Sequence, residues 1–174
     1  RTYPDELGGA PRYVYAFEAR MKGTPDFTAI ILGTFDGGSA SRGRGELAMD
    51  FDALRALGMH DASTPTGGMW VGYDRSADPI TIRLFVDPDG PAGSEVFGYQ
   101  FAGYAAGGGV FDYVLRDASA NTLFIATRYD AAGAGRARVA FQPAGAAVAG
   151  YFEQCWDAGA TLVYVNDPGN YSCD

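Results

Sequence analysis

The residues that could support nucleophilic catalysis are few. The chain of 174 residues has one histidine, His60, and two cysteines, Cys155 and Cys173. A serine or cysteine nucleophile needs a histidine base that is held by a carboxylate. Asp61 is the sequence neighbour of the histidine, a position that rarely gives this geometry, and no G-x-S-x-G segment marks a nucleophile elbow. The sequence therefore favours a non-catalytic protein, with a hydrolase that uses carboxylates alone as the enzymatic alternative.

The spacing of Cys155 and Cys173 favours a disulfide. A separation of 18 residues fits neither a CxxC redox motif nor a four-ligand zinc site. Closing such a loop stabilises a fold by about 3 kcal/mol in the chain-entropy model, and the cross-link would hold the C-terminal residues. Disulfides persist outside the reducing cytosol. We therefore expect an extracytoplasmic protein, in the periplasm, on the outer-membrane surface or secreted.

No cluster of residues predicts a metal ion or a cofactor. One histidine and two oxidised cysteines leave zinc without ligands. The acidic segment 87–95 has its glycine at the fourth position and its glutamate at the ninth, whereas an EF-hand needs the sixth and the twelfth. Neither Gly43-Arg44-Gly45 nor Gly133-Ala134-Gly135 continues into a phosphate-binding loop. We expect no metal site and no cofactor.

Four arginines are candidates for binding an anionic group. They form two pairs near the starts of expected strands, Arg42 with Arg44 and Arg136 with Arg138. Residues two apart on a strand project from the same face, so each pair could bind an anionic ligand or a lipid headgroup. Alternatively, they pair with carboxylates on neighbouring strands, such as Glu46 or Asp130.

Aromatic residues at alternate positions are the second candidate for a binding site. They are Tyr99 and Phe101 on one expected strand, and Phe111 and Tyr113 on the next. These side chains could line an apolar cavity or a sugar-stacking platform. Alternatively, they fill the inner face of a sheet, with tyrosine hydroxyls at its rim.

Period-two alternation predicts the strands that must position these residues. Turn residues separate nearly every pair of apolar segments, and the spacing suits hairpins rather than β-α-β crossovers. The expected strands are 12–20, 27–35, 44–50, 68–74, 79–86, 95–104, 109–116, 122–129, 135–142, 150–156 and 161–166. One segment, 50–58, has Phe51, Leu54 and Leu57 at helical spacing, between Asp50 as N-cap and Gly58 at the C-terminal end.

These elements predict one antiparallel all-β domain over residues 1–174. We expect a flexible lead at 1–11 and a tail at 167–174 that the disulfide holds. No convincing internal repeat is evident. About ten strands in a meander must hide their edges, so we expect a curled half-barrel or barrel, with a two-sheet β-sandwich as the alternative.

Composition excludes several classes of protein. The net charge of −8 argues against nucleic-acid binding, and no apolar run approaches the length of a transmembrane helix. The aromatic content of 14% argues against disorder.

Part of the C-terminal half resembles a family of uncharacterised secreted or lipoprotein-like proteins of myxobacteria and their relatives. The resemblance is carried by Thr127 to Ala137, Glu153-Gln154-Cys155-Trp156-Asp157 and Val163-Tyr164, and it extends over roughly residues 44–166. In that family a glutamate is expected directly before the cysteine, whereas Gln154 stands there in this chain. The resemblance implies a location outside the cytosol and no known activity.

Together, these observations predict a non-catalytic, extracytoplasmic β-domain that binds or supports another component. The aromatic strands suit an apolar or lipid-like ligand. The alternative is a protein-interaction subunit of a cell-envelope or extracellular assembly.

Overall fold

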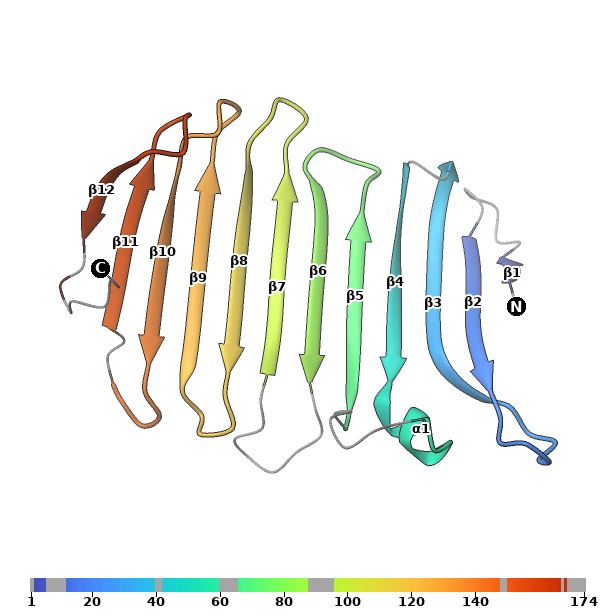
Figure 1. Ribbon diagram of the computed structural model, residues 1–174. Helices are drawn as coiled ribbons and strands as arrows, with labels where there is room; N and C mark the ends of the chain where they lie inside the picture. The colour runs from blue at the N-terminus through green and yellow to red at the C-terminus, as the bar shows by residue number, and fades with distance from the viewer. Residues whose placement is uncertain are drawn as a thin grey trace.

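The fold is one antiparallel sheet of twelve strands (Figure 1). The computed structural model describes residues 2–5, 12–39, 42–59, 66–87, 96–147, 150–166 and 168. The strands lie in the sheet in sequence order, so each one pairs only with its neighbours along the chain. The all-β class, the antiparallel meander and the short helix expected from the sequence are confirmed.

The strand limits follow the predicted ranges closely. The strands are β1 (Thr2–Asp5), β2 (Arg12–Ala19), β3 (Thr28–Ser39), β4 (Arg42–Asp50), β5 (Gly68–Asp74), β6 (Ile80–Asp87), β7 (Val96–Gly103), β8 (Gly109–Arg116), β9 (Thr122–Tyr129), β10 (Gly135–Gln142), β11 (Gly150–Trp156) and β12 (Leu162–Asn166). Thr2–Asp5, expected within a flexible lead, instead pairs with β2 as an edge strand.

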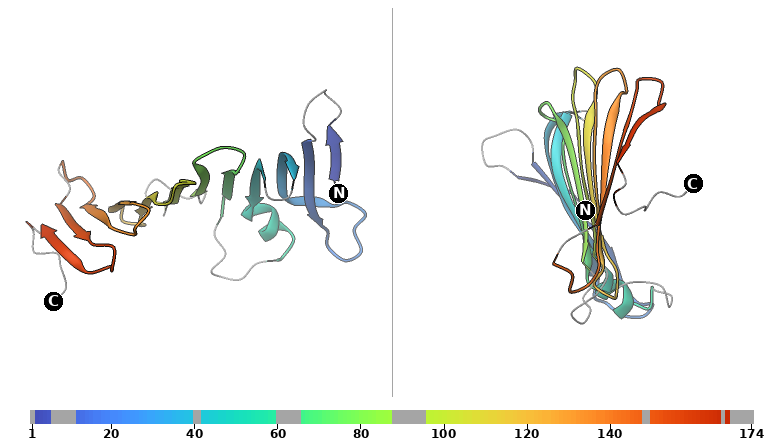
Figure 2. Two further views of the ribbon diagram at one scale, coloured as in Figure 1. Left: turned by 90° about the horizontal axis from the view of Figure 1, so that it is seen from above. Right: turned by 90° about the vertical axis from the view of Figure 1, so that its left-hand side faces the viewer.

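The sheet is open rather than closed into a barrel. Figure 2 shows one undulating, twisted layer with β1 and β12 at opposite ends. The register explains this shape, because the central residues Tyr15, Gly33, Leu47, Val71, Leu84, Tyr99, Tyr113, Ile125, Val139 and Phe152 form one straight row across β2–β11. Closure needs strands that are progressively staggered, and these strands are not.

The one helix among the described residues, α1 (Phe51–Ala56), begins and ends as predicted. The Asp50 carboxylate accepts a hydrogen bond from the Ala53 N–H at 2.8 Å, which caps the first turn. Gly58 adopts a φ of +67° just past the last turn. The helix lies at the ends of β4 and β5 (Figure 1), where the Phe51 N–H donates to the Gly67 carbonyl at 2.8 Å.

A structural repeat of 13 residues runs through the C-terminal half, contrary to the expectation of no repeat. Five-residue loops begin at Tyr104, Asp117 and Asp130, and each is followed by a strand of eight residues. In each loop the backbone carbonyl of the first residue accepts a hydrogen bond from the N–H of the fourth residue. The N–H of the first residue donates a hydrogen bond to the carbonyl of the fifth residue. The repeat lies in backbone geometry, which several residue combinations satisfy, so the sequence reading missed it.

The described strands form a single layer, so few of their side chains are buried. Among the described residues, the apolar side chains that are buried are only Ile30, Ala102 and Ala137. No second sheet packs on the described strands, so the β-sandwich alternative is not the structure of this chain. No helix in the described ranges is long and apolar enough to cross a membrane.

Candidate functional site: an uncharged aromatic face of the sheet

The two faces of the sheet differ in charge. Paired residues in neighbouring strands point to the same face, so the register sorts every strand residue. Outside the β-bulge at Glu18, the charged side chains described on β2–β11 all lie on one side, which we call the charged face. They are Arg12, Asp36, Arg42, Arg44, Glu46, Asp50, Asp74, Arg83, Asp112, Arg116, Arg128, Arg136, Arg138 and Glu153.

The opposite side, which we call the uncharged face, is apolar and aromatic over the same ten strands. Its three central rows contain Tyr13, Tyr15, Phe17, Ile31, Gly33, Phe35, Gly45, Leu47, Met49, Met69, Val71, Tyr73, Ile82, Leu84, Val86, Phe97, Tyr99, Phe101, Phe111, Tyr113, Leu115, Leu123, Ile125, Thr127, Ala137, Val139, Phe141, Gly150, Phe152 and Gln154. Such a row composition is typical of the inner layer of a β-sandwich.

Four predicted binding residues meet at the centre of the uncharged face. Tyr99 and Phe101 on β7 pair in register with Tyr113 and Phe111 on β8. The Tyr99 and Phe111 ring centroids are 5.8 Å apart. Phe97, on the same face of β7, completes the cluster with its ring 5.3 Å from that of Tyr113 in an edge-to-face arrangement.

Glycines let several aromatic rings lie flat against the sheet. Tyr73 lies over Gly45, and Tyr129 lies over Gly109, each directly across the ladder. A Cβ atom at either glycine would stand 2.6 Å from the tyrosine hydroxyl, closer than real contacts allow. Trp156 covers Gly135 in the same way. The rings therefore cover the neighbouring backbone rather than stand upright from the sheet.

The hydroxyl of Tyr15 shows that the uncharged face is partly desolvated even in the single chain. It donates a hydrogen bond to the Glu46 carbonyl at 3.3 Å across Gly33. Burial raises the pKa of Tyr15 above its ordinary value, and the nearby Tyr73 raises it further.

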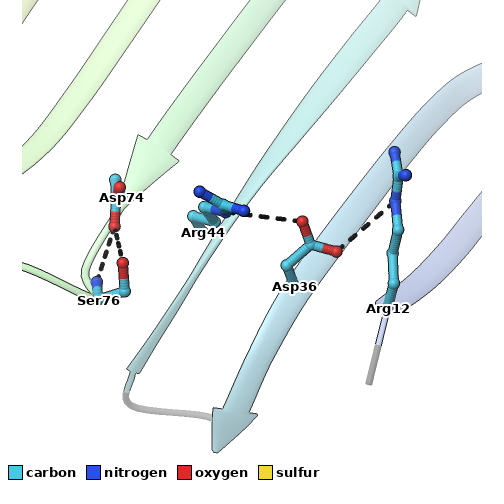
Figure 3. A network of polar contacts seen from close by, with 5 residues as sticks. All are labelled: Arg12, Asp36, Arg44, Asp74 and Ser76. Atoms are coloured by element: carbon cyan, nitrogen blue, oxygen red, sulfur yellow. Dashed lines mark hydrogen bonds and ion pairs between the residues drawn. The ribbon is translucent and has the colours of Figure 1, made fainter. Parts of the chain in front are cut away.

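Ion pairs run along one end of the charged face (Figure 3). Asp36 lies between Arg12 and Arg44, with a carboxylate oxygen 3.6 Å from the Nε of each. Beyond Arg44, Asp74 accepts hydrogen bonds from the Ser76 hydroxyl and backbone N–H. These bonds lower the pKa of Asp74 against the small opposing effect of burial, and Arg44 lowers it further.

The structure places the predicted arginine pairs far apart on the charged face. Arg44 is on β4 and bound to Asp36, whereas Arg136 and Arg138 are on β10, six strands away. The Arg138 guanidinium lies 4.6 Å from the ring centroid of Tyr151. Arg42, at the exposed start of β4, lies beside neither pair partner on β10. The four arginines therefore form no common anion site.

Two features of the charged face were not found from the sequence. Arg128 binds Asp112 through both carboxylate oxygens, at 2.7 and 3.2 Å. These residues are diagonal neighbours on β9 and β8, so alternation within one strand gives no signal for the pair. An open apolar hollow of about 380 Å³ also lies on this face, among Trp70, Phe85, Val114 and Phe124. The hollow is formed by the cross-strand pairs Trp70 with Phe85 and Val114 with Phe124, and this register is not readable from the strands taken one at a time.

The remaining candidates lie partly outside the described residues. Cys155 is half-buried on β11, while Cys173 falls outside the described ranges, so the disulfide stays a prediction. His60 and most of the acidic segment 87–95 are also outside them. Within the part of the chain that is described, no three His, Cys, Asp or Glu residues gather as a metal site.

The uncharged face is therefore the largest feature of the molecule that calls for a functional explanation. Comparison with protein-family models, curated proteins and solved structures gives no match for this chain.

Proposed function

We propose that the protein is a non-catalytic binding and structural domain that acts by covering its uncharged face with another apolar surface. The supporting observation is that the described charges on β2–β11 lie on the opposite face, with the exception of Glu18, which follows the bulge and pairs with Ala29 at the end of β2. A domain normally buries its apolar faces between two packed layers. Here the described residues form one layer, so we infer that a partner supplies the other.

The geometry favours a macromolecular partner over a small ligand on this face. Small-molecule sites are concave and enclose most of the ligand surface. The uncharged face follows a twisted, open layer, and rings such as Tyr73 and Tyr129 lie against glycines instead of enclosing a cavity. A small molecule would be covered on one side only, whereas another extended surface would cover the face fully.

Tyrosine nitration of the protein in an extract of the cells that make it tests this function. Tyr99 and Tyr113 are half-buried on the uncharged face, whereas Tyr151 is half-buried on the charged face. We expect Tyr99 and Tyr113 to react at least about tenfold more slowly than Tyr151, because a partner excludes the reagent. Equal reaction rates of all three tyrosines would show a bare face and contradict the proposal.

The hollow on the charged face supports a second candidate function, the binding of a small apolar molecule. Its volume of about 380 Å³ is within the usual range of ligand sites, and Phe124 on its wall is 44% exposed. Organic extraction and mass spectrometry should then recover a bound molecule, and Phe124→Gln should abolish its recovery. Phe141→Gln is the matched control, since Phe141 is 43% exposed on the other face. Ligand-free wild-type protein would contradict this candidate.

We further propose that the domain works outside the cytosol, as the resemblance to secreted proteins and the spacing of Cys155 and Cys173 suggest. Mass spectrometry after alkylation without reductant tests this proposal on freshly isolated protein. We expect no alkylated thiol. Two alkylated cysteines would rule out the disulfide and remove the main support for this location.

A further inference from the structure

We propose that the occupant of the uncharged face is a second copy of this chain, which gives a two-fold symmetric dimer of two sheets packed face to face. This inference rests on the proposed function, since it names the partner that covers the same surface. Four properties of the molecule support a second copy: the area of the face, its twist, the distribution of residue sizes and the position of the positive charges.

The area of the face is sufficient for a stable dimer. Ten strands of about eight residues, with about 4.8 Å between strands and about 3.3 Å per residue, span roughly 48 by 26 Å, or roughly 1,200 Å². A stable interface of standard size buries about 800 Å² on each partner. Overlap of two thirds of the uncharged face is therefore enough for a specific dimer.

The twist of the sheet also suits an identical partner. Packed sheets keep their strand directions within about 30° of each other when both sheets have the same right-handed twist. A second copy has this twist and span by identity. A partner of another fold would need a twisted apolar layer of the same width, ten strands from β2 to β11.

The distribution of side-chain sizes is self-complementary about the centre of the sheet. The midpoint of β2–β11 lies between β6 and β7. A two-fold axis there, parallel to the strands, places the aromatic β7 of one copy on the aliphatic β6 of the other. Tyr99 then lies opposite Leu84, so that a large ring meets a smaller branched side chain. Next to this contact, β8 lies on β5, where Phe111 meets Tyr73 as an aromatic pair.

The charges disfavour a lipid surface as the occupant. Anionic membranes attract basic residues that flank an apolar surface. Here the strand arginines lie on the opposite face, and the net charge of the chain is −8. In the face-to-face dimer these same arginines and carboxylates stay in water on the two outer surfaces.

Sedimentation equilibrium of the purified full chain, from 1 to 100 μM, is the direct test. We expect a mass of about 37 kDa, twice the 18.4 kDa of one chain. A mass of 18.4 kDa throughout this range would overturn the dimer. Slow nitration of Tyr99 and Tyr113 in the cell extract would then still support the proposed function with a different partner, whereas fast nitration would remove both proposals.

Two adjacent residues on β7 provide a matched pair of variants. Tyr99 points to the uncharged face and Gln100 to the charged face, where it is exposed. Tyr99→Arg buries an unpaired charge at the interface, so we expect self-association at least about 100-fold weaker, while Gln100→Arg stays dimeric. Circular dichroism confirms that each variant is folded. A folded Tyr99→Arg dimer of unchanged affinity would overturn the proposal.

Leu84→Arg on β6 repeats the test should Tyr99→Arg fail to fold. We expect the same loss of self-association, because Leu84 lies opposite Tyr99 of the second copy. The sedimentation mass of the wild-type protein depends on neither variant, so it decides between monomer and dimer even if both variants fail to fold.

Discussion

At the residue scale, three hairpin loops depend on one aspartate each. Asp117, Asp130 and Asp157 occupy the first position of five-residue loops, and each carboxylate accepts hydrogen bonds from the third and fifth backbone N–H groups at 2.9 or 3.0 Å. The fourth residue of each loop has a positive φ: Ala120, Gly133 and Ala160. Two alanines therefore occupy a conformation that suits glycine.

Replacing those alanines should stabilise the protein. Ala120 and Ala160 have φ values of +64° and +59°. We expect Ala120→Gly and Ala160→Gly each to raise the free energy of unfolding by about 0.5–1 kcal/mol, because glycine has no Cβ to strain in this region. Thermal unfolding measures the effect. Ala118→Gly is the control, because Ala118 lies in the same loop as Ala120 at an ordinary φ, and we expect this variant to be less stable than the wild type. A loss of stability in all three variants would show that the backbone is not strained at Ala120 and Ala160.

Asp117 should contribute to stability in a pH-dependent manner. The Asn121 side chain lowers its pKa against the opposing effect of burial, and the Asn121 and Ser119 N–H groups lower it further. This contribution is complete above the unfolded pKa of about 3.9 and is lost as the pH falls through the lower folded value. We expect Asp117→Asn to lower the urea midpoint at pH 7 and to converge with the wild type near pH 2. A constant difference between the two proteins at both pH values would contradict the prediction.

The sequence could predict some of these residue details and not others. Asp50 as N-cap and Gly58 as the left-handed C-terminal residue were predictable, because both residue types have strong positional preferences. Ala120 and Ala160 at positive φ were not, because alanine is rarely found there. The diagonal Arg128–Asp112 pair required the register between strands, which depends on loop geometry.

At the scale of the strands, aromatic rings seated on glycines hold neighbouring strands together. Gly109→Ala would place a Cβ atom 2.6 Å from the Tyr129 hydroxyl and 2.9 Å from the Ala102 carbonyl oxygen. We expect a loss of about 1–3 kcal/mol in the free energy of unfolding, because the ring must lift off the sheet. Gly159→Ala is the control, since the added Cβ meets nothing closer than 3.3 Å. Equal melting temperatures for the two variants would contradict a seated ring.

The edge strand β12 has an exposed apolar surface. Leu162, Val163, Tyr164 and Val165 are 44–61% exposed. An exposed apolar edge with unpaired backbone groups can pair with another chain. We expect Val163→Lys to reduce light scattering in concentrated solution and to change the free energy of unfolding by less than about 0.5 kcal/mol. Unchanged scattering would show that this edge does not mediate association.

Strands were more predictable than the relation between them. Period-two alternation and turn residues located eleven of the twelve strands, because each signal is local in sequence. β1 was missed, since Thr2–Asp5 contains proline and no alternation of its own. The sequence left an open half-barrel and a closed barrel as alternatives for a different reason: whether a meander closes depends on the stagger between strands, and here the strand centres lie in one row, which leaves the sheet open.

At the scale of the whole molecule, the contrast between the faces assigns roles to the predicted site residues. Alternation already placed Tyr99, Phe101, Phe111 and Tyr113 on common strand faces. The expectation that they fill an inner face implied a second layer, which the described residues do not provide. The alternation of apolar and polar residues is the same whichever molecule covers the face. The sequence could therefore predict an inner face but not what covers it.

The strictly sequential strand order has a consequence for how the molecule opens. Each internal strand is held by two ladders to its chain neighbours, so strands can be lost from β1 or β12 one at a time without breaking any ladder further in. Repeat proteins behave in this way, with stability that adds along one dimension. Amide hydrogens should accordingly exchange fastest in the terminal strands and progressively more slowly toward β6 and β7, because opening begins at both edges of the sheet.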